Sequence, residues 1–110
     1  MKLPNAARAI VDIAKLRDYS LNPHHKEGKH KARVFAAALG LSLADGDWLR
    51  EQLLAVARKR DCELGRQTAY GQRYVIDFVA SHQDRSAKLR SVWIVRLGED
   101  FPRLVTCYVL

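Results

Sequence analysis

The stretch of sequence that decides the fold is Arg73-Tyr74-Val75-Ile76-Asp77-Phe78-Val79-Ala80, in which the side chains alternate between two surfaces. A period of two is typical of a β-strand that buries one face, because successive side chains point to opposite sides. One face carries Tyr74, Ile76, Phe78 and Ala80, and the other carries Arg73, Val75, Asp77 and Val79. We therefore expect Arg73 to Ala80 to be a strand of a sheet with one buried face.

Alternating patterns predict three further strands, over Cys62 to Thr68, Lys88 to Leu97 and Arg103 to Val109. The connections between the strands are short, so the predicted sheet is antiparallel. In the last strand, Leu104, Thr106 and Tyr108 are expected to share one face. Arginines on three successive strands, Arg73, Arg90 and Arg103, are candidates to line one face of the sheet, and their register is left open.

Helical periodicity precedes the strands. A short helix is predicted from about Ala14 to Leu21, and apolar residues repeat at helical spacing over His30 to Leu39. A third helix is expected after the capping box Ser42 to Asp45, ending near Arg60. The predicted fold class is α+β: two to three N-terminal helices packed on a four-stranded antiparallel sheet, in a single domain over residues 1–110.

The charge composition favours a polyanionic partner. The chain has 110 residues with 19 Lys and Arg against 12 Asp and Glu, a formal net charge of +7. Such a charge attracts nucleic acid, and it attracts an acidic protein such as an inhibitor equally well. Nothing resembles a membrane span or a secretory signal, so we expect no membrane association. The expected location is the cytoplasm, or a target cell's cytoplasm after delivery as part of a larger effector.

The segment from Leu21 to Ala32 gathers three of the four histidines and three lysines ahead of the second predicted helix. Backbone N–H groups at a helix N-terminus, with ammonium and imidazole groups beside them, suit a phosphate-like anion. Imidazoles can also transfer protons near neutral pH. The alternative, a solvated basic connecting loop, stays open.

Spacing disfavours several catalytic chemistries. The histidines do not stand at the four-residue separation of a zinc-binding helix, and no third ligand follows at a recognisable distance, so we expect no metal and no other cofactor. Cys62 and Cys107 alternate with apolar residues, which is typical of buried, reduced thiols rather than of nucleophiles. A glycine-rich phosphate loop is also missing from the sequence.

Metal-independent RNA cleavage requires only a base, an acid and positive charge around the phosphate, and the chain offers all three. The candidate catalytic residues are His25, His30, Lys31 and Thr106. The candidate substrate-binding residues are Lys29, Arg73, Arg90, Ser91, Arg103 and Tyr108. The strand residues among them have structural alternatives as ordinary strand, core or surface residues.

A set of short motifs extends over nearly the whole chain. They are Lys15-Leu16, Tyr19, Leu21-Asn22-Pro23, His25, Gly28, Lys31-Ala32, Phe35, Leu39-Gly40, Tyr70-Gly71, Tyr74, Trp93-Ile94, Pro102-Arg103-Leu104-Val105-Thr106 and Tyr108. Their order resembles small toxin-like domains of unknown function that occur in bacterial polymorphic and phage-associated toxins and beside small partner genes. Such domains are similar to the barnase, EndoU, colicin and RelE-like group of metal-independent RNases. The sequence departs from this pattern at Lys26, where proline is common.

The resemblance implies N-terminal helices on a four-stranded antiparallel sheet and a toxic RNase activity. It implies active groups at Lys31, with His30 beside it, and on the strand that contains Thr106. Our first hypothesis is accordingly a bacterial toxin-type RNase held in check by an acidic antitoxin or immunity protein, as a monomer or a homo-oligomer. The alternatives are a non-catalytic module that binds RNA or an acidic protein, and the neutralising partner of a toxin pair.

Overall fold

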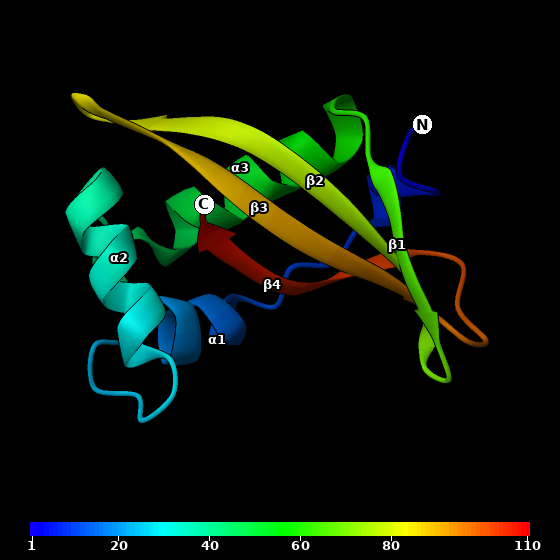
Figure 1. Cartoon of the computed structure of the whole chain (residues 1–110), viewed down its shortest axis with the longest axis horizontal. Helices are drawn as coiled ribbons and strands as arrows, with labels where there is room; N and C mark the ends of the chain where they lie inside the picture. The colour runs from blue at the N-terminus through cyan, green and yellow to red at the C-terminus, as the bar shows by residue number, and fades with distance from the viewer.

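The computed structural model describes all 110 residues, and its largest element is a four-stranded antiparallel sheet (Figure 1). The strands are β1 (Glu63–Thr68), β2 (Gly71–His82), β3 (Arg85–Arg96) and β4 (Pro102–Val109), and each pairs with the next. All helices precede the strands in the chain. The structure therefore confirms the predicted α+β fold class, and it lengthens the β2–β3 hairpin beyond the predicted strands.

The helices lie close to where periodicity placed them. Helix α1 (Ile13–Lys15) continues directly into a π-helical turn, η2 (Leu16–Ser20). Helices α2 (Lys29–Leu39) and α3 (Gly46–Lys59) follow, and the 3-10 turns are η1 (Ala6–Arg8) and η3 (Leu43–Asp45). The predicted capping box forms at the start of η3, immediately ahead of α3. None of these helices has the length and apolarity needed to cross a membrane.

A single hydrophobic core lies between the helices and one face of the sheet. In β2 and β3 the core side chains alternate along each strand, led by Ile76, Phe78, Leu89 and Trp93, so the structure decides which of the two predicted faces is buried. The helices contribute the apolar stripes of α2 and α3, with Phe35, Leu39, Leu49 and Leu53 fully or almost fully buried. Figure 1 shows α3 running along one side of the sheet and α2 beside the end of β4.

The opposite side of the sheet, which we call the open face, carries three cross-strand rows. From one end to the other, the rows are Asp77–Arg90–Tyr108, Val75–Val92–Thr106 and Arg73–Ile94–Arg103. Residues that pair directly across antiparallel strands project to the same side. Arg73, Arg90 and Arg103 therefore share the open face, and the pairing supplies the register that the sequence left open.

Strand β4 contains a bulge that changes the predicted assignment of its side chains. Thr106 pairs with Val92 while Leu104 pairs with Trp93, which leaves Val105 as an extra residue. An extra residue reverses the alternation beyond it. Leu104 consequently faces the core, at 3% exposure, whereas Thr106 lies on the open face. The prediction that these two side chains share a face was wrong.

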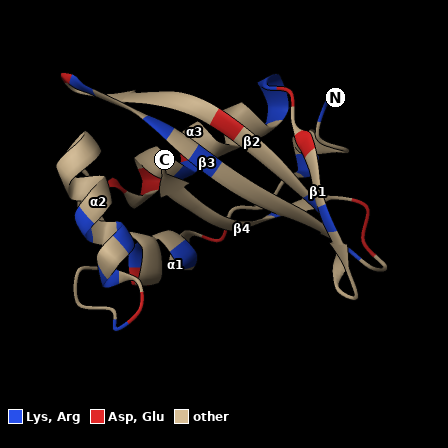
Figure 2. Cartoon of the chain, viewed as in Figure 1, with Lys and Arg blue, Asp and Glu red and all other residues tan.

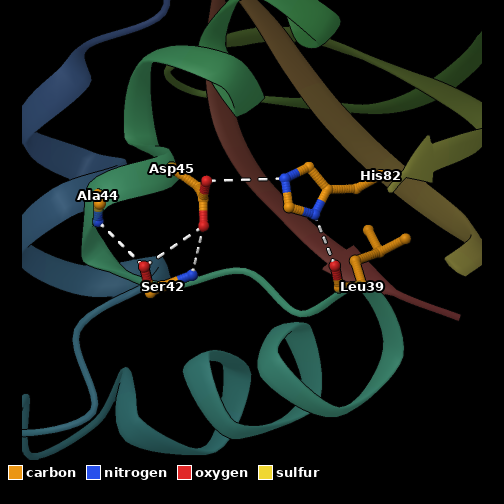
Figure 3. A network of polar contacts seen from close by, with 5 residues as sticks. All are labelled: Leu39, Ser42, Ala44, Asp45 and His82. Carbon is orange, nitrogen blue, oxygen red and sulfur yellow. Dashed lines mark hydrogen bonds and ion pairs between the residues drawn. The ribbon is translucent and has the colours of Figure 1, made fainter. Parts of the chain in front are cut away.

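A polar network ties the tip of the β2–β3 hairpin to the helices (Figure 3). The His82 Nδ1 lies 2.8 Å from the Leu39 carbonyl oxygen at the end of α2, and its Nε2 lies 3.6 Å from Asp45 Oδ1. The other oxygen of Asp45 accepts from the Ser42 backbone N–H. Arg85 of the hairpin also donates hydrogen bonds to two carbonyl oxygens in the last turn of α2. The hairpin thus supplies partners for carbonyls that a helix end leaves free.

Candidate functional site

Lys31 is the residue at which the helical half of the chain meets the open face of the sheet. Its Nζ donates a 2.7 Å hydrogen bond to Thr106 Oγ1. Helix α2 lies beside β4, the edge strand, so the lysine reaches over that edge. The side chain is half-buried and forms no salt bridge with a carboxylate. An unneutralised, partly desolvated ammonium beside an oriented hydroxyl is well suited to binding an anion.

Two aromatic rings flank this ammonium. The Nζ of Lys31 lies 5.1 Å from the ring centroid of Tyr19 and 5.7 Å from that of Tyr108. Cation–π contacts hold a charge in place without neutralising it. The structure therefore keeps the Lys31 charge available to a ligand.

The buried thiol beneath Lys31 is not a nucleophile. Burial raises the pKa of Cys107 to about 12, although the nearby Lys31 charge acts in the opposite direction. The thiol is fully buried and stays protonated at neutral pH. Cysteine chemistry requires a thiolate, so Cys107 is a core residue, and so is the buried Cys62.

Local backbone structure fixes where Lys31 stands. The Leu21 N–H donates to the Leu16 carbonyl at 2.8 Å, five residues back, which is the π-helical turn that contains Tyr19. Gly28 then packs against that turn: a Cβ at position 28 would lie 2.1 Å from the Tyr19 carbonyl oxygen. Only glycine allows this approach, and Gly28 is the N-cap of α2. The contact therefore sets the start of α2, three residues before Lys31.

His25 is built into the loop ahead of α2. Its Nδ1 accepts hydrogen bonds from the backbone N–H groups of Glu27 and Gly28, at 3.0 and 2.9 Å. Its ring also packs edge-on against Tyr19, with centroids 4.9 Å apart. From these contacts we assign the proton of the neutral ring to Nε2, since Nδ1 is an acceptor. His25 thus stabilises the loop and packs against Tyr19, and its Nδ1 is not free to act as a base.

His30 lies at the edge of an open hollow of about 260 Å³ that it shares with Lys31, Val34, Tyr108 and Val109. It is exposed and has no hydrogen-bond partner in the protein. The structure thus brings His30, Lys31 and Tyr108 together. The neighbouring Lys29 is also exposed, but its side chain does not line this hollow.

Arg90 lies on the open face beside Tyr108 and is already paired. Its guanidinium makes a bidentate ion pair with Asp77 across β2 and β3, with N–O distances of 2.8 and 2.9 Å. This pairing, and secondarily the Tyr108 hydroxyl, raises the pKa of Arg90 further above its ordinary value. The same contact lowers the pKa of Asp77. Figure 2 shows the acidic band on β2 next to a basic band on β3. Arg90 can orient Tyr108, but its Nε and one of its terminal nitrogens already donate to Asp77.

Ser91 is not part of this site, which corrects the expectation that it contacts substrate. It is fully buried on the core side of β3. Its hydroxyl donates to the Ile76 carbonyl oxygen and accepts from the Trp93 Nε1. The physical reason is the alternation itself, because Ser91 stands between Leu89 and Trp93 on the buried face. The hydroxyl serves to satisfy the indole N–H within the core.

The two remaining arginines, Arg73 and Arg103, lie at the far end of the open face, in the third row. Arg103 forms a bidentate ion pair with Glu99, with both N–O distances 2.9 Å, and this contact lowers the pKa of Glu99. Arg73 forms no salt bridge, and its Nε is buried without a hydrogen-bond partner. Only one of these two guanidinium groups is therefore unneutralised.

Sequence reasoning gave Tyr19, Asp77 and Glu99 no role in the site. Tyr19 reaches the site through a π-helical turn, and helical periodicity carries no signal for such a turn. Asp77 and Glu99 matter because they neutralise arginines. Asp77 could have been found from a correct β2–β3 register, whereas the pairing of Glu99 with Arg103 depends on the path of the β3–β4 turn, for which the sequence carries no spacing rule.

The polar network at the tip of the β2–β3 hairpin does not have the order of a catalytic triad. In the network of Ser42, Asp45 and His82, the aspartate stands between the serine and the histidine (Figure 3). A serine nucleophile needs the histidine in direct contact, so this order cannot activate it. The structure also contains no group of three His, Cys, Asp or Glu side chains placed to hold a metal ion.

Comparison with protein families places the whole fold in one family. The model of DUF6883, a domain of unknown function, matches residues 2–110. The chain belongs to the DUF6883 family. No curated protein matches it. The match covers α2, the open face and the residues around Lys31, so the candidate site lies entirely within the DUF6883 domain.

Proposed function

We propose that this DUF6883 domain is a toxin-type ribonuclease that binds RNA on its open face and cleaves it without a metal ion. The observation that supports this is the meeting of His30 and Lys31 from α2 with Thr106 and Tyr108 from β4. A proton-transfer group, a cation and hydroxyl donors in one place are what phosphodiester cleavage by internal attack requires.

In this reaction the ribose 2′-hydroxyl attacks the adjacent phosphorus and the bond to the 5′-oxygen breaks. One proton leaves the 2′-hydroxyl and one is delivered to the 5′-oxygen, which yields a 2′,3′-cyclic phosphate and a 5′-hydroxyl. We assign His30 as the base, because its ring is unpaired at the rim of the hollow. The Tyr108 hydroxyl, next to Arg90, is the donor to the leaving oxygen.

Lys31 has the electrostatic role in this assignment. Negative charge builds on the non-bridging oxygens as the phosphorane forms, and an ammonium fixed in advance stabilises that charge. Thr106, Tyr19 and Tyr108 hold the Nζ in place, so little reorganisation is needed when RNA binds. The same unneutralised surface suits an acidic antitoxin or immunity protein, which would block the site by occupying it.

A second candidate, RNA binding without cleavage, is favoured by the way the histidines are held. The Nδ1 of His25 is occupied by backbone donors, and no side chain orients His30. A general base is usually held by a third group, so His30 would have to be ordered by the RNA itself. Binding without cleavage would leave the cationic open face as the functional element.

The experiment is an RNA cleavage assay with protein treated with EDTA. Wild-type protein is expected to yield fragments ending in 2′,3′-cyclic phosphate, and Lys31→Met to reduce the rate by about 100- to 1000-fold, as loss of one transition-state donor does. Arg33→Met is the matched control, because Arg33 is an exposed cation on the same helix that lines neither the hollow nor the open face.

The outcomes separate the candidates. RNA that is shifted in a gel but stays intact supports the non-catalytic module. If the protein neither binds nor cleaves RNA, both candidates are refuted. Failure to inhibit growth on expression would then favour the neutralising partner of a toxin pair. Equal rates for Lys31→Met and Arg33→Met would remove Lys31 from the mechanism while leaving cleavage established. Matching thermal unfolding of the two variants is the folding control.

A further inference from the structure

A second cationic hollow opens at the other end of the open face. It has a volume of about 560 Å³ and lies where the β1–β2 turn meets the end of β3 and the start of β4. Its walls include four cationic side chains, Lys15, Arg73, Arg96 and Arg103, and no carboxylate. Four like charges around one concave space create a strong local attraction for an anion.

The cations in this hollow are neutralised to different degrees. Arg103 is paired with Glu99, and the Lys15 Nζ donates only to the Leu104 carbonyl oxygen, at 3.2 Å. Arg96 and Arg73 make no salt bridge, and the Arg73 Nε is buried without any partner. The charges of Arg73 and Arg96 are therefore not neutralised within the protein, and an anionic ligand can pair with their guanidinium groups without displacing a carboxylate.

An aromatic ring stands at the edge of the same hollow. Tyr70, in the β1–β2 turn, is 78% exposed, the largest exposure among the large hydrophobic side chains. Its backbone is fixed on both sides: its N–H donates to Thr68 Oγ1 and its carbonyl accepts from the Leu97 N–H. The next residue, Gly71, has φ +147° and lies so close to β3 that a Cβ would be 2.1 Å from the Val95 carbonyl oxygen. The backbone of this turn is therefore held in place, and the Tyr70 ring is exposed to solvent.

We propose that this hollow is a nucleotide subsite for single-stranded RNA, which holds one phosphate between Arg73 and Arg96 and stacks the adjoining base on Tyr70. Guanidinium groups that surround an anionic oxygen, with an exposed aromatic beside them, are the combination by which single strands are bound without sequence readout. The proposal rests on the proposed function, because it makes the hollow a continuation of the Lys31 site.

The spacing of the two sites fits one strand of RNA. Thr106 and Arg73 lie in adjacent same-face rows, about 7 Å apart along the strands, and on β4 and β2, which are two strand spacings of about 4.8 Å apart, so they are roughly 12 Å from each other. A stacked nucleic-acid strand advances by roughly 3.4 Å per phosphate. Thr106 and Arg73 are therefore about three to four nucleotides apart in a stacked strand. An acidic protein loop is the competing ligand, because the same cations attract it, and the binding assay below distinguishes it from RNA.

The test measures binding of a fluorescent single-stranded RNA oligonucleotide at several salt concentrations, in the Lys31→Met background so that the RNA stays intact. Arg73→Met is expected to weaken binding and to reduce the salt slope by about 0.7, the value of one phosphate contact with a single strand. Tyr70→Ala is expected to weaken binding by about 5- to 100-fold with an unchanged salt slope, because it removes one base stack. Arg58→Met is the control: Arg58 is an exposed cation of α3 with no hydrogen bond or salt bridge.

A second readout separates the failure of this subsite from the failure of the proposed function. A dinucleoside monophosphate is too short to reach the hollow, so its cleavage by the wild-type protein tests the proposed function independently of the subsite. Cleavage by wild type, with oligonucleotide affinities that neither variant changes, would overturn the subsite and leave the RNase standing. A wild-type chain that neither binds nor cleaves RNA overturns both. If the two variants weaken binding of an acidic inhibitor but not of RNA, the hollow is a protein-binding site and the proposal is wrong.

Discussion

Replacement of Gly28 with alanine tests whether the contact between α2 and the Tyr19 turn positions the site. A Cβ at residue 28 would lie 2.1 Å from the Tyr19 carbonyl oxygen and 2.8 Å from its carbonyl carbon, and both atoms are backbone. Ordinary contact for a Cβ begins at 3.4 Å, so the two segments must separate by about 1.3 Å. That displacement is close to the rise of one helical residue, roughly 1.5 Å.

The expected effect is a loss of both stability and activity. Overpacking of this size costs about 1–3 kcal/mol, or a fall of about 4–12 °C in the unfolding temperature for a domain of this length. Lys31 stands in the first turn of the displaced helix, 2.7 Å from Thr106 Oγ1, and a further 1.3 Å would break that hydrogen bond. A misplacement of about 1 Å is expected to lower the cleavage rate by about 100-fold.

The matched control is Gly46→Ala at the start of α3. Both glycines have helical backbone angles, with φ −77° at Gly28 and −56° at Gly46, so alanine is conformationally allowed at each. At position 46 the nearest atom to a Cβ is the flexible Arg17 side chain, at 3.0 Å. Calorimetry and the RNA cleavage assay are run on both variants below their unfolding temperatures. If Gly28→Ala unfolds and cleaves like Gly46→Ala, the positioning argument is refuted.

Two further predictions concern titrating groups. Arg90 holds the pKa of Asp77 below its usual range, so the ion pair adds stability above the unfolded pKa of about 3.9 and loses it as pH falls through the folded value. Asp77→Asn should therefore lower the free energy of unfolding by about 1 kcal/mol at neutral pH, and in denaturant titrations the difference from wild type should shrink as pH falls below the unfolded pKa of the carboxyl and vanish below its folded pKa. Burial raises the pKa of both Cys107 and Cys62, so alkylation by iodoacetamide should be slow in the native protein and become fast only in denaturant. Rapid native modification of Cys107 would contradict its placement in the core.

The β2 strand shows what a sequence can predict about this fold. Its alternation separated two sets of side chains, and the structure buries the set that contains Ile76 and Phe78. The same reasoning failed in β4, where a bulge at Val105 reversed the alternation. A bulge depends on pairing with the neighbouring strand, and such long-range pairing is not visible in the local pattern.

The candidate site could likewise be predicted only in part from the sequence. Lys31 could be singled out because it opens a helix whose apolar stripe fixes which side faces outward. Its partner Thr106 is 75 residues away, so their contact could only be hypothesised. The role of His25 was unpredictable for a different reason: a histidine ring that accepts two backbone N–H groups looks, in sequence, the same as one that is free to transfer protons.

The net charge of +7 is a poor guide to where a polyanion binds, and the pairing of individual charges is a better one. On the open face, Arg90 and Arg103 each face a carboxylate in a bidentate pair, so each presents little net charge to a ligand. Lys31 and Arg73 have no carboxylate partner, and both are partly desolvated. An RNA strand that contacts these two gains charge–charge attraction without first breaking an internal ion pair. Removal of Lys31 or Arg73 should therefore weaken RNA binding more than removal of Arg90 or Arg103, although all four carry the same formal charge.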